Sequence, residues 1–231
     1  MNFSIWSNLQ EGERMNTVVF DMDGVLFDSE TLCRDSWIAI AEESGLPGMK
    51  EIFPKCIGLN ANDSRQIVME AYGPDFDYEG FRKRASVWFW DNIEKNGLAV
   101  KPGVRELLQW LKENGWIIGL ASSTRRSSVE KCLEKAGITE YFQEIITGDM
   151  VEHSKPLPDI YLLACDRLGK RPEECYAIED SPNGIRSAHA AGMHPLMVPD
   201  MIAPDEEMRL LSERIFESLH EVKSFFGDNM K

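Results

Sequence analysis

The sequence has little of what marks a secreted, zinc-binding or membrane-spanning protein. Its five cysteines are widely spaced in 231 residues and form no Cys-x-x-Cys pair: Cys33, Cys56, Cys132, Cys165 and Cys175. An odd set of scattered thiols indicates a reduced protein without a disulfide framework or structural zinc. The N-terminal stretch lacks the apolar run of a signal peptide, and no segment approaches the roughly 20 apolar residues of a membrane helix. We therefore expect a cytoplasmic protein with no membrane partner.

Positive charge and histidine are also scarce. Lysine and arginine number 25 against 39 aspartates and glutamates, which gives a formal net charge of −14. Such an acidic chain repels nucleic acid, and it favours a small partner that arrives with a metal cation. The four histidines have no metal-ligand spacing, so we expect them to be structural or solvated. What the chain does have is a 43% apolar fraction, which supports a real core.

Short apolar segments rich in β-formers alternate with helical patterns along most of the chain. Glycines stand after several of these helical patterns, where a left-handed cap belongs. Several of the strand segments lack polar alternation, as strands buried on both faces do. The pattern predicts an α/β fold of three layers, with a parallel sheet between helices. The predicted strands are 17–20, 116–120, 144–147, 175–178, 195–198 and 214–216, and the predicted helices are 103–113, 126–136, 158–168 and 183–191.

One section interrupts this alternation. From about residue 31 to residue 98 the sequence has helical periodicity and no convincing strand. We therefore predict an α/β core formed by 16–30 and 99–231, an inserted all-helical domain at 31–98, and a loosely packed N-terminal extension at 1–15. Nothing in the sequence indicates an oligomer, so a monomer is the default expectation.

Polar side chains follow four of the predicted strands at the points where those strands end. In open parallel sheets, ligands bind beyond the carboxyl ends of the strands, so we expect these side chains to meet in one crevice. They are, in chain order, Asp21 and Asp23; Ser122, Ser123, Thr124 and Arg125; Lys155; and Glu179 and Asp180.

This set of residues points to phosphate chemistry with a metal ion. Four carboxylates in one crevice do not all stay ionised unless a cation compensates them, and oxygen-only ligands suit Mg²⁺. Hydroxyl and backbone N–H groups suit phosphate oxygens, and a lysine adds a point positive charge. Beside such a metal, one aspartate can act as a nucleophile, and a second can protonate the leaving oxygen and later activate water. The i, i+2 spacing puts Asp21 and Asp23 on one side of an extended segment.

Four segments of the sequence resemble the four motifs of the haloacid dehalogenase superfamily. They are "DMDGVLFDSE", "LASST", "SKPLPDIY" and "IEDSPNGI". The sequence is most similar to the branch of sugar-phosphate phosphatases and β-phosphoglucomutase-like enzymes. The resemblance covers about residues 16–220, and it implies a Rossmann-like core with a helical cap that closes over the substrate.

The resemblance also implies a role for each motif residue. Asp21 would be the nucleophile and a Mg²⁺ ligand, and Asp23 would be the general acid and base, with its backbone carbonyl on the metal. Ser122 and Lys155 would hold the oxygens of the phosphoryl group. Asp180, with Glu179 in support, would complete the metal site. The activity implied is a Mg²⁺-dependent phosphatase that acts on a small phosphorylated metabolite, a sugar or polyol phosphate, through an aspartyl-phosphate.

Some positions depart from the mutase pattern of that branch. The mutases have a threonine and a histidine after the first motif and an arginine in the cap loop, whereas the matching positions here are Ser29, Cys33 and Ala61. Hydrolysis is therefore favoured over a sugar phosphomutase activity, which stays as an alternative. A non-catalytic family member used for regulation or binding is the alternative of another class.

The substrate pocket would lie between the cap and the strand ends. We expect Gly58 and Asn60, in a predicted cap loop, and Ser29, Ser123, Thr124 and Arg125 to face the substrate. Trp88 and Phe89 have the helical spacing of cap-core residues, whereas Trp90 points elsewhere and would cover the seam between cap and core. Cys33 lies near the hinge, where we expect it to pack rather than react.

Overall fold

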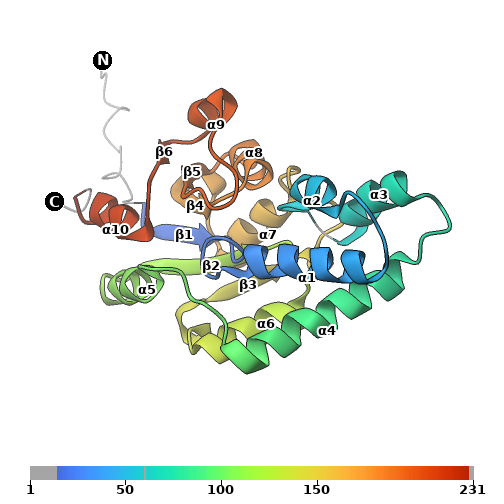
Figure 1. The fold of residues 1–231 in the computed structure, drawn as a ribbon. Helices are drawn as coiled ribbons and strands as arrows, with labels where there is room; N and C mark the ends of the chain where they lie inside the picture. Colours follow the sequence, from blue (N-terminus) through green and yellow to red (C-terminus); the bar gives the residue numbers. More distant parts are fainter. Residues whose placement is uncertain (1–14, 60, 229–231) are drawn as a thin grey trace, which may run out of the picture.

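A computed structural model describes residues 15–59 and 61–228 of the chain (Figure 1). The predicted N-terminal extension therefore lies outside the described residues, except for Met15, which packs against the main core. Asn60 also lies outside them.

The centre of the molecule is a parallel sheet of six strands. Their spatial order is β3-β2-β1-β4-β5-β6, and every neighbouring pair is parallel. The predicted parallel sheet is thus confirmed, with shifts of one or two residues at strand ends. The strands are β1 (Thr17–Phe20), β2 (Ile117–Ser122), β3 (Glu144–Thr147), β4 (Cys175–Glu179), β5 (His194–Met197) and β6 (Arg214–Ile215).

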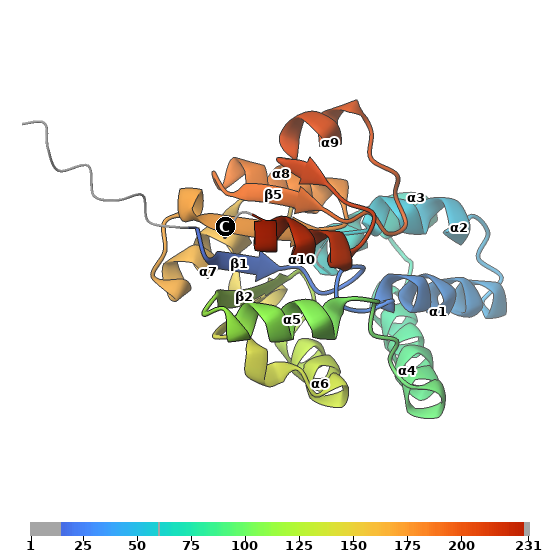
Figure 2. The same ribbon diagram turned by 90° about the vertical axis from the view of Figure 1, so that its left-hand side faces the viewer.

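Helices cover both faces of this sheet. Alternate residues of β1 pack to opposite sides, with Val18 and Phe20 in one buried cluster and Val19 in another. The first cluster includes the apolar faces of α5 (Val104–Glu113), α6 (Arg126–Ala136) and α10 (Leu219–Asp228), of which α5 and α10 lie side by side (Figure 2). The second includes α7 (Asp159–Leu168) and α8 (Pro182–Ala190). The predicted three layers are therefore confirmed.

The remaining short elements connect these layers. They are α9 (Glu206–Leu211) between β5 and β6, and the 3-10 turns Thr139–Tyr141, Gly148–Met150 and Pro172–Glu174. None of the described helices is both long enough and apolar enough to cross a membrane. All five cysteines are free thiols, as the sequence predicts.

Four helices and a 3-10 turn separate β1 from α5, as the helical periodicity predicts. They are α1 (Ser29–Glu43), α2 (Met49–Ile52), the turn Phe53–Cys56, α3 (Ala61–Tyr72) and α4 (Tyr78–Asn96). Figure 1 shows them gathered beyond the carboxyl ends of the strands. They share a buried cluster of their own around Trp37, Phe53 and Phe81. We refer to this group as the cap; its domain boundaries at 30/31 and 98/99 stay a prediction.

Aromatic residues near the end of α4 divide between two environments. Trp88 packs against the cap cluster, and Trp90 packs against the sheet core, as predicted. The prediction for Phe89 is wrong, because Phe89 is half-buried and lines a cavity between the cap and the strand ends. Each residue turns by about 100° along a helix, so Phe89 cannot share the direction of Trp88.

Candidate active site

The carboxyl ends of β1, β2 and β4, with the loop after β3, bring the predicted polar residues together. Asp21 and Asp23 follow β1, Ser122 ends β2, and Glu179 ends β4. The parallel register aligns these ends, since Phe20 pairs with both Leu120 and Ile178. Residues from 21 to 180 therefore meet at one edge of the sheet.

Lys155 forms the buried centre of this group. Its Nζ lies 2.5 Å from Asp21 Oδ1 and 2.7 Å from Glu179 Oε1, and it donates to the carbonyl of Ala121 at 3.0 Å. Only 1% of Lys155 is exposed. Burial alone would lower the pKa of this ammonium, but the attraction of Asp21 and Glu179 outweighs it and raises the pKa above its usual value. Lys155 is therefore a fixed positive charge beneath the crevice.

One lysine does not compensate the acidic groups around it. Burial raises the pKa of Asp21 well above its usual value, and the neighbouring carboxylates Glu179 and Asp23 add to the rise against the opposing effect of Lys155. Burial also raises the pKa of Asp180, with Glu30 as the next cause. The group is short of positive charge, so a cation would be bound favourably there.

The carboxylates are close enough to share such a cation. Asp21, Glu179 and Asp180 are buried, and each offers one oxygen such that all three oxygens lie within 4.8 Å of one another. Gly24 leaves room for this arrangement, because a Cβ at Gly24 would lie 2.3 Å from Asp180 Oδ2. A set made of carboxylate oxygens alone fits a hard cation such as Mg²⁺.

The Asp23 carboxylate has hydroxyl groups as its hydrogen-bond partners among the described residues. Ser29 Oγ donates to Asp23 Oδ1 at 2.5 Å, and Thr124 Oγ1 donates to Oδ2 at 2.9 Å. Ser122 Oγ lies 3.4 Å from the same Oδ2, and the backbone N–H of Thr124 donates to Ser122 Oγ at 3.1 Å. These bonds fix the position of the Asp23 carboxyl group at the edge of the cavity.

Glycine and serine at the start of α8 position Glu179. Ser181 Oγ accepts from the backbone N–H of Gly184 at 3.1 Å and so caps the helix. Gly184 packs directly against Glu179, whose carboxylate atoms lie 1.9 to 2.1 Å from where a Cβ would be. The helix therefore approaches the strand end closely only because residue 184 has no side chain.

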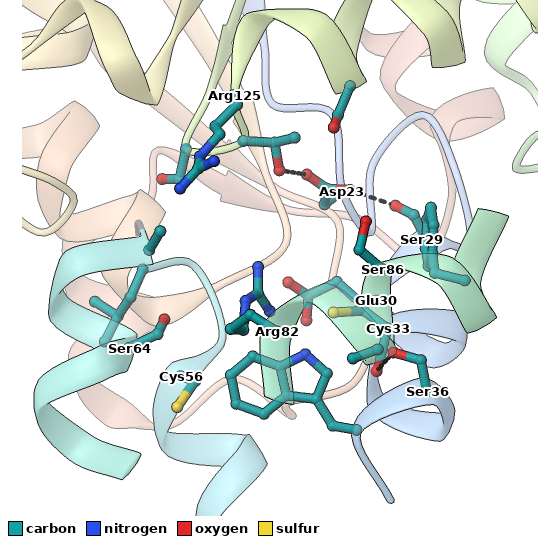
Figure 3. Close-up of a pocket in the computed structure, with 18 of the residues that line it drawn as sticks. Asp23, Ser29, Glu30, Cys33, Ser36, Cys56, Ser64, Arg82, Ser86 and Arg125 are labelled. Atoms are coloured by element: carbon teal, nitrogen blue, oxygen red, sulfur yellow. Dashed lines mark hydrogen bonds between the residues drawn. The ribbon is translucent and has the colours of Figure 1, made fainter. Parts of the chain in front are cut away.

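The cap closes over these groups and leaves a cavity of about 620 Å³ (Figure 3). Asp21, Asp23 and Asp180 line its core side, with Ser123 and Arg125 nearby, and Arg125 points into the space in Figure 3. The predicted substrate residues Ser29, Gly58, Ser123, Thr124 and Arg125 all line this cavity. Asn60 lies outside the described residues, and Ser122 and Lys155 are buried below the crevice.

Two of these residues, Ser123 and Gly58, are hydrogen-bonded to each other. Ser123 Oγ donates to the carbonyl of Gly58 at 3.0 Å, which joins the core to the cap. Cys33 also lines the cavity, and burial raises the pKa of its thiol to about 12. This thiol is therefore neutral and inert at ordinary pH, which agrees with a packing role.

Several residues of the site were missed by reasoning from the sequence. Tyr161 donates its hydroxyl to Glu179 Oε1 at 2.6 Å, and it lies at the end of the quoted motif "SKPLPDIY". Glu30 and Arg82 line the cap side of the cavity. Glu30 could have been found because it is the last residue of the quoted motif "DMDGVLFDSE", whereas Arg82 had no signal in the sequence.

Comparisons with known proteins agree with this arrangement. The profile of the haloacid dehalogenase-like hydrolases matches residues 15–192. A phosphorylated carbohydrates phosphatase of Thermotoga maritima is 34% identical over 179 residues, which cover 78% of this chain and 82% of that protein. Beta-phosphoglucomutase of Bacillus subtilis is 31% identical over 217 residues, which cover 90% of this chain and 95% of that protein.

A solved structure gives the same result for the fold. The crystal structure of CbbY from Rhodobacter sphaeroides in complex with phosphate superposes with a TM-score of 0.77 at 26% identity, covering 90% of this chain and 96% of that one. The family profile matches well over half of the chain, and the alignments cover 82% and 95% of the two relatives. The chain therefore belongs to the haloacid dehalogenase-like hydrolase family.

Proposed function

We propose that the protein is a Mg²⁺-dependent phosphatase that hydrolyses a small phosphorylated metabolite through an aspartyl-phosphate on Asp21. The observation that carries this proposal is the buried trio of Asp21, Lys155 and Glu179 next to the separately held Asp23. One carboxylate lies beside fixed positive charge, as a nucleophile toward phosphorus requires. The other is held in place by the hydroxyl groups of Ser29 and Thr124 at the edge of the cavity, where an acid and base can reach the ester oxygen.

The metal would be held by Asp21 and Asp180, with Glu179 in support and the backbone carbonyl of Asp23. When bound, Mg²⁺ supplies positive charge that neutralises both the carboxylates and the phosphoryl oxygens. Lys155 adds its own positive charge from below, and the Ser122 hydroxyl and nearby backbone N–H groups can donate to phosphoryl oxygens.

In the first half-reaction, an oxygen of Asp21 attacks the phosphorus of the ester. The bond from phosphorus to the ester oxygen breaks while the bond to Asp21 forms. Asp23 donates its proton to the departing oxygen, so the product leaves as a neutral alcohol. Ser29 and Thr124 keep the Asp23 carboxyl group aimed at that oxygen.

In the second half-reaction, Asp23 accepts a proton from water, which attacks the phosphorus of the aspartyl-phosphate. The bond between phosphorus and Asp21 breaks, inorganic phosphate forms, and the Asp21 carboxylate is restored. The cap must exclude bulk water in the first step and then admit one water, so it must open and close during turnover.

A sugar phosphomutase is the second candidate, because the Bacillus subtilis relative is a beta-phosphoglucomutase. Such an enzyme would protect the aspartyl-phosphate from water and then transfer its phosphoryl group to a second hydroxyl of the sugar. Cys33 and Ala61 stand where the mutase pattern has a histidine and an arginine, and a buried neutral thiol cannot replace a cation. The similarity to a phosphorylated carbohydrates phosphatase favours hydrolysis of a sugar or polyol phosphate.

The test is release of inorganic phosphate from a panel of sugar, polyol and nucleotide monophosphates, with and without Mg²⁺. We expect release that EDTA abolishes and Mg²⁺ restores, and a loss of at least about 1,000-fold in kcat in Asp21→Asn, because the nucleophile is removed. Asp166→Asn, at an exposed position on α7, is the matched control and keeps wild-type activity.

Metal-independent release, or full activity in Asp21→Asn, contradicts the proposal. Conversion of a sugar 1-phosphate to its 6-phosphate with little free phosphate would favour the mutase.

A further inference from the structure

The cap side of the cavity carries a guanidinium that forms no ion pair with a described carboxylate. Arg82 lies on α4 and lines the cavity, and Figure 3 shows its side chain pointing into the space on the side opposite Asp23. None of the ion pairs among the described residues includes it. In a chain with 39 acidic residues and 25 basic ones, an inward-facing arginine without such a partner is unusual.

The position of this guanidinium is fixed by its neighbours. Arg82 Cζ lies 4.8 Å from the centre of the Trp37 ring, and Trp37 is held edge-on by Phe53 at 5.3 Å and Phe81 at 5.6 Å. Arg82 also lies near the thiol of Cys33, where its positive charge opposes the rise in the thiol pKa that burial causes. A guanidinium held against an aromatic face keeps its N–H donors directed along one plane. Arg82 is therefore a positioned donor rather than a mobile surface charge.

Two further polar groups around the cavity lack a partner among the described residues. Trp37 Nε1 is a buried donor, and Glu30 Oε2 is a buried acceptor. A buried polar group without a hydrogen bond costs about 1 to 3 kcal/mol, so groups of this kind in a cavity wall indicate a ligand. Together with Arg82, these groups give the cavity wall two donors near each other, on Arg82 and Trp37, and one acceptor near the reaction centre, on Glu30.

From this set we infer that Arg82 determines specificity by binding an anionic group on the leaving-group end of the substrate. This inference rests on the proposed phosphatase function. When the cap closes, a guanidinium taken out of water needs a counter-charge, and no described carboxylate, Glu30 included, forms an ion pair with it. The fork of N–H donors fits a carboxylate or a phosphate, and Glu30 can accept from a hydroxyl near the ester. The substrate class is a small hydroxylated phosphomonoester with a second anionic group.

The experiment compares two matched pairs of substrates with Mg²⁺ present. One pair is 6-phosphogluconate and glucose 6-phosphate, which differ in a carboxylate. The other pair is fructose 1,6-bisphosphate and fructose 6-phosphate, which differ in a phosphate. We expect the wild-type enzyme to have the higher kcat/KM for the anionic member of at least one pair, and that pair identifies the anion. In Arg82→Gln the preference within that pair falls about 30-fold, the loss of one charged hydrogen-bonding contact.

Arg84→Gln is the matched control on the same helix. Arg84 is exposed, and it donates to Glu43 Oε2 at 2.8 Å and to Ser44 Oγ at 2.9 Å, away from the cavity. This variant keeps the wild-type preference. Arg82→Lys retains part of it, because the charge stays but the fork is lost, and Arg82→Glu reverses it. A ratio of two substrates on the same protein does not depend on the folded fraction, so a destabilised variant still gives an answer.

The outcomes separate this inference from the proposed function. A wild-type enzyme that releases phosphate without preferring an anionic substrate overturns the role of Arg82, and so does an unchanged preference in Arg82→Gln. In both cases the proposed phosphatase function stands. If the wild-type enzyme releases no phosphate from any of the four substrates or from the broader panel, the proposed function fails, and this inference fails with it.

Discussion

Two aspartates that lie two positions apart in the sequence have different partners in the fold. Asp21 forms an ion pair with Lys155, whereas Asp23 accepts hydrogen bonds from the hydroxyls of Ser29 and Thr124. Lys155 opposes the rise in the pKa of Asp21 that burial causes, whereas the hydroxyl partners of Asp23 bring no charge to it. This difference between neighbours supports the assignment of the nucleophile to Asp21 and of the acid and base to Asp23.

Tyr161→Phe tests how strongly the buried carboxylate Glu179 depends on its hydrogen bond from the Tyr161 hydroxyl. The variant removes only the hydroxyl that donates to Glu179 Oε1 at 2.6 Å, and Tyr161 is fully buried. We expect the free energy of unfolding to fall by about 1.5 to 3 kcal/mol, the range for hydrogen bonds to charged groups. If Glu179 supports the metal, the Mg²⁺ concentration for half-maximal activity also rises, by about 10-fold.

The control for this prediction is Tyr72→Phe. Tyr72 also donates through its hydroxyl, to the carbonyl of Pro47 at 2.8 Å, but this bond is exposed to water, which can replace it. We expect a change within about 0.5 kcal/mol in urea unfolding. If the two variants lose the same free energy of unfolding, the bond from Tyr161 to Glu179 stabilises the fold no more than an exposed bond does.

At the scale of elements, the first turn of helix α8 positions the carboxylate at the end of strand β4. Helix α8 begins directly after the strand end that carries Glu179 and Asp180, and the absence of a side chain at Gly184 allows its first turn to contact Glu179. Gly184 does not have a positive φ, so its requirement is steric rather than conformational. The turn after β1 needs glycine for both reasons, because Gly24 has a φ of 82° and lies against Asp180.

Gly184→Ala is expected to push Glu179 away from Lys155. The added methyl would lie about 2 Å from the Glu179 carboxylate, which is inside any permitted contact distance. We expect the free energy of unfolding to fall by about 1 to 3 kcal/mol, as in other overpacked interiors. The phosphatase activity should fall as well, because Lys155 loses a fixed partner. Thermal unfolding and phosphate release measure the two effects.

Gly227→Ala is the opposite case and serves as the control. Gly227 lies in α10, where a Cβ would meet only Trp110 at 3.8 Å, an ordinary contact. Alanine is the better helix former, so this variant should gain up to about 1 kcal/mol of stability. Destabilisation by Gly227→Ala, or no effect of Gly184→Ala, would contradict the packing described for these two helices.

At the scale of the whole molecule, the cap and the core are joined on both sides of the cavity. Glu94 on α4 forms an ion pair with Lys135 on α6 at 2.8 Å, and Lys131 lies 3.8 Å from the centre of the Trp90 ring. On the other side Met201 and Ile202 pack against the cap cluster, and hydrogen bonds between described residues join Ser123 to Gly58, Asn183 to Ile57, and Ser154 to Asp63. Polar contacts of this kind exchange readily with water, so the structure represents a closed cap that can open.

The closed arrangement predicts how the thiols respond to pH. Burial raises the pKa of Cys33 to about 12, that of Cys56 to about 11 and that of Cys132 to about 12. At pH 8 these groups are protonated, and only the thiolate is alkylated. We expect iodoacetamide labelling of the folded protein to be slow at pH 8 and to rise about tenfold with each pH unit up to pH 10.

Urea-unfolded protein provides the comparison for this labelling. Its thiols have a pKa of about 8.5, so labelling should be fast at pH 8 and level off above about pH 9. Mass spectrometry of the labelled peptides identifies each cysteine. Rapid labelling of Cys33 in the folded protein at pH 8 would show that the cap is mostly open in solution.

Much of this protein could be predicted from local patterns. The strand Thr17–Phe20 is apolar on both faces, and the spacing of Val104, Leu107, Leu108 and Leu111 gives α5 a single buried side. Asp21, Lys155 and Asp180 were found because polar residues at strand ends stand out against buried segments. Phe89 was misplaced and Arg82 was missed, because helical periodicity does not show what a helix packs against.

The sequence by itself determined the parallel sheet, the helical cap and the set of charged residues at the carboxyl ends of the strands. These follow from hydrophobic periodicity and from residue types at strand ends, which are local properties of the chain. Only the tertiary structure decided the partners of those charges: Lys155 between Asp21 and Glu179, Tyr161 on Glu179, and Arg82 against the ring of Trp37. Asp21 lies 134 positions and Glu179 lies 24 positions from Lys155 along the chain, and both bind its ammonium group. Such pairings depend on how helices and strands pack rather than on any pattern along the chain.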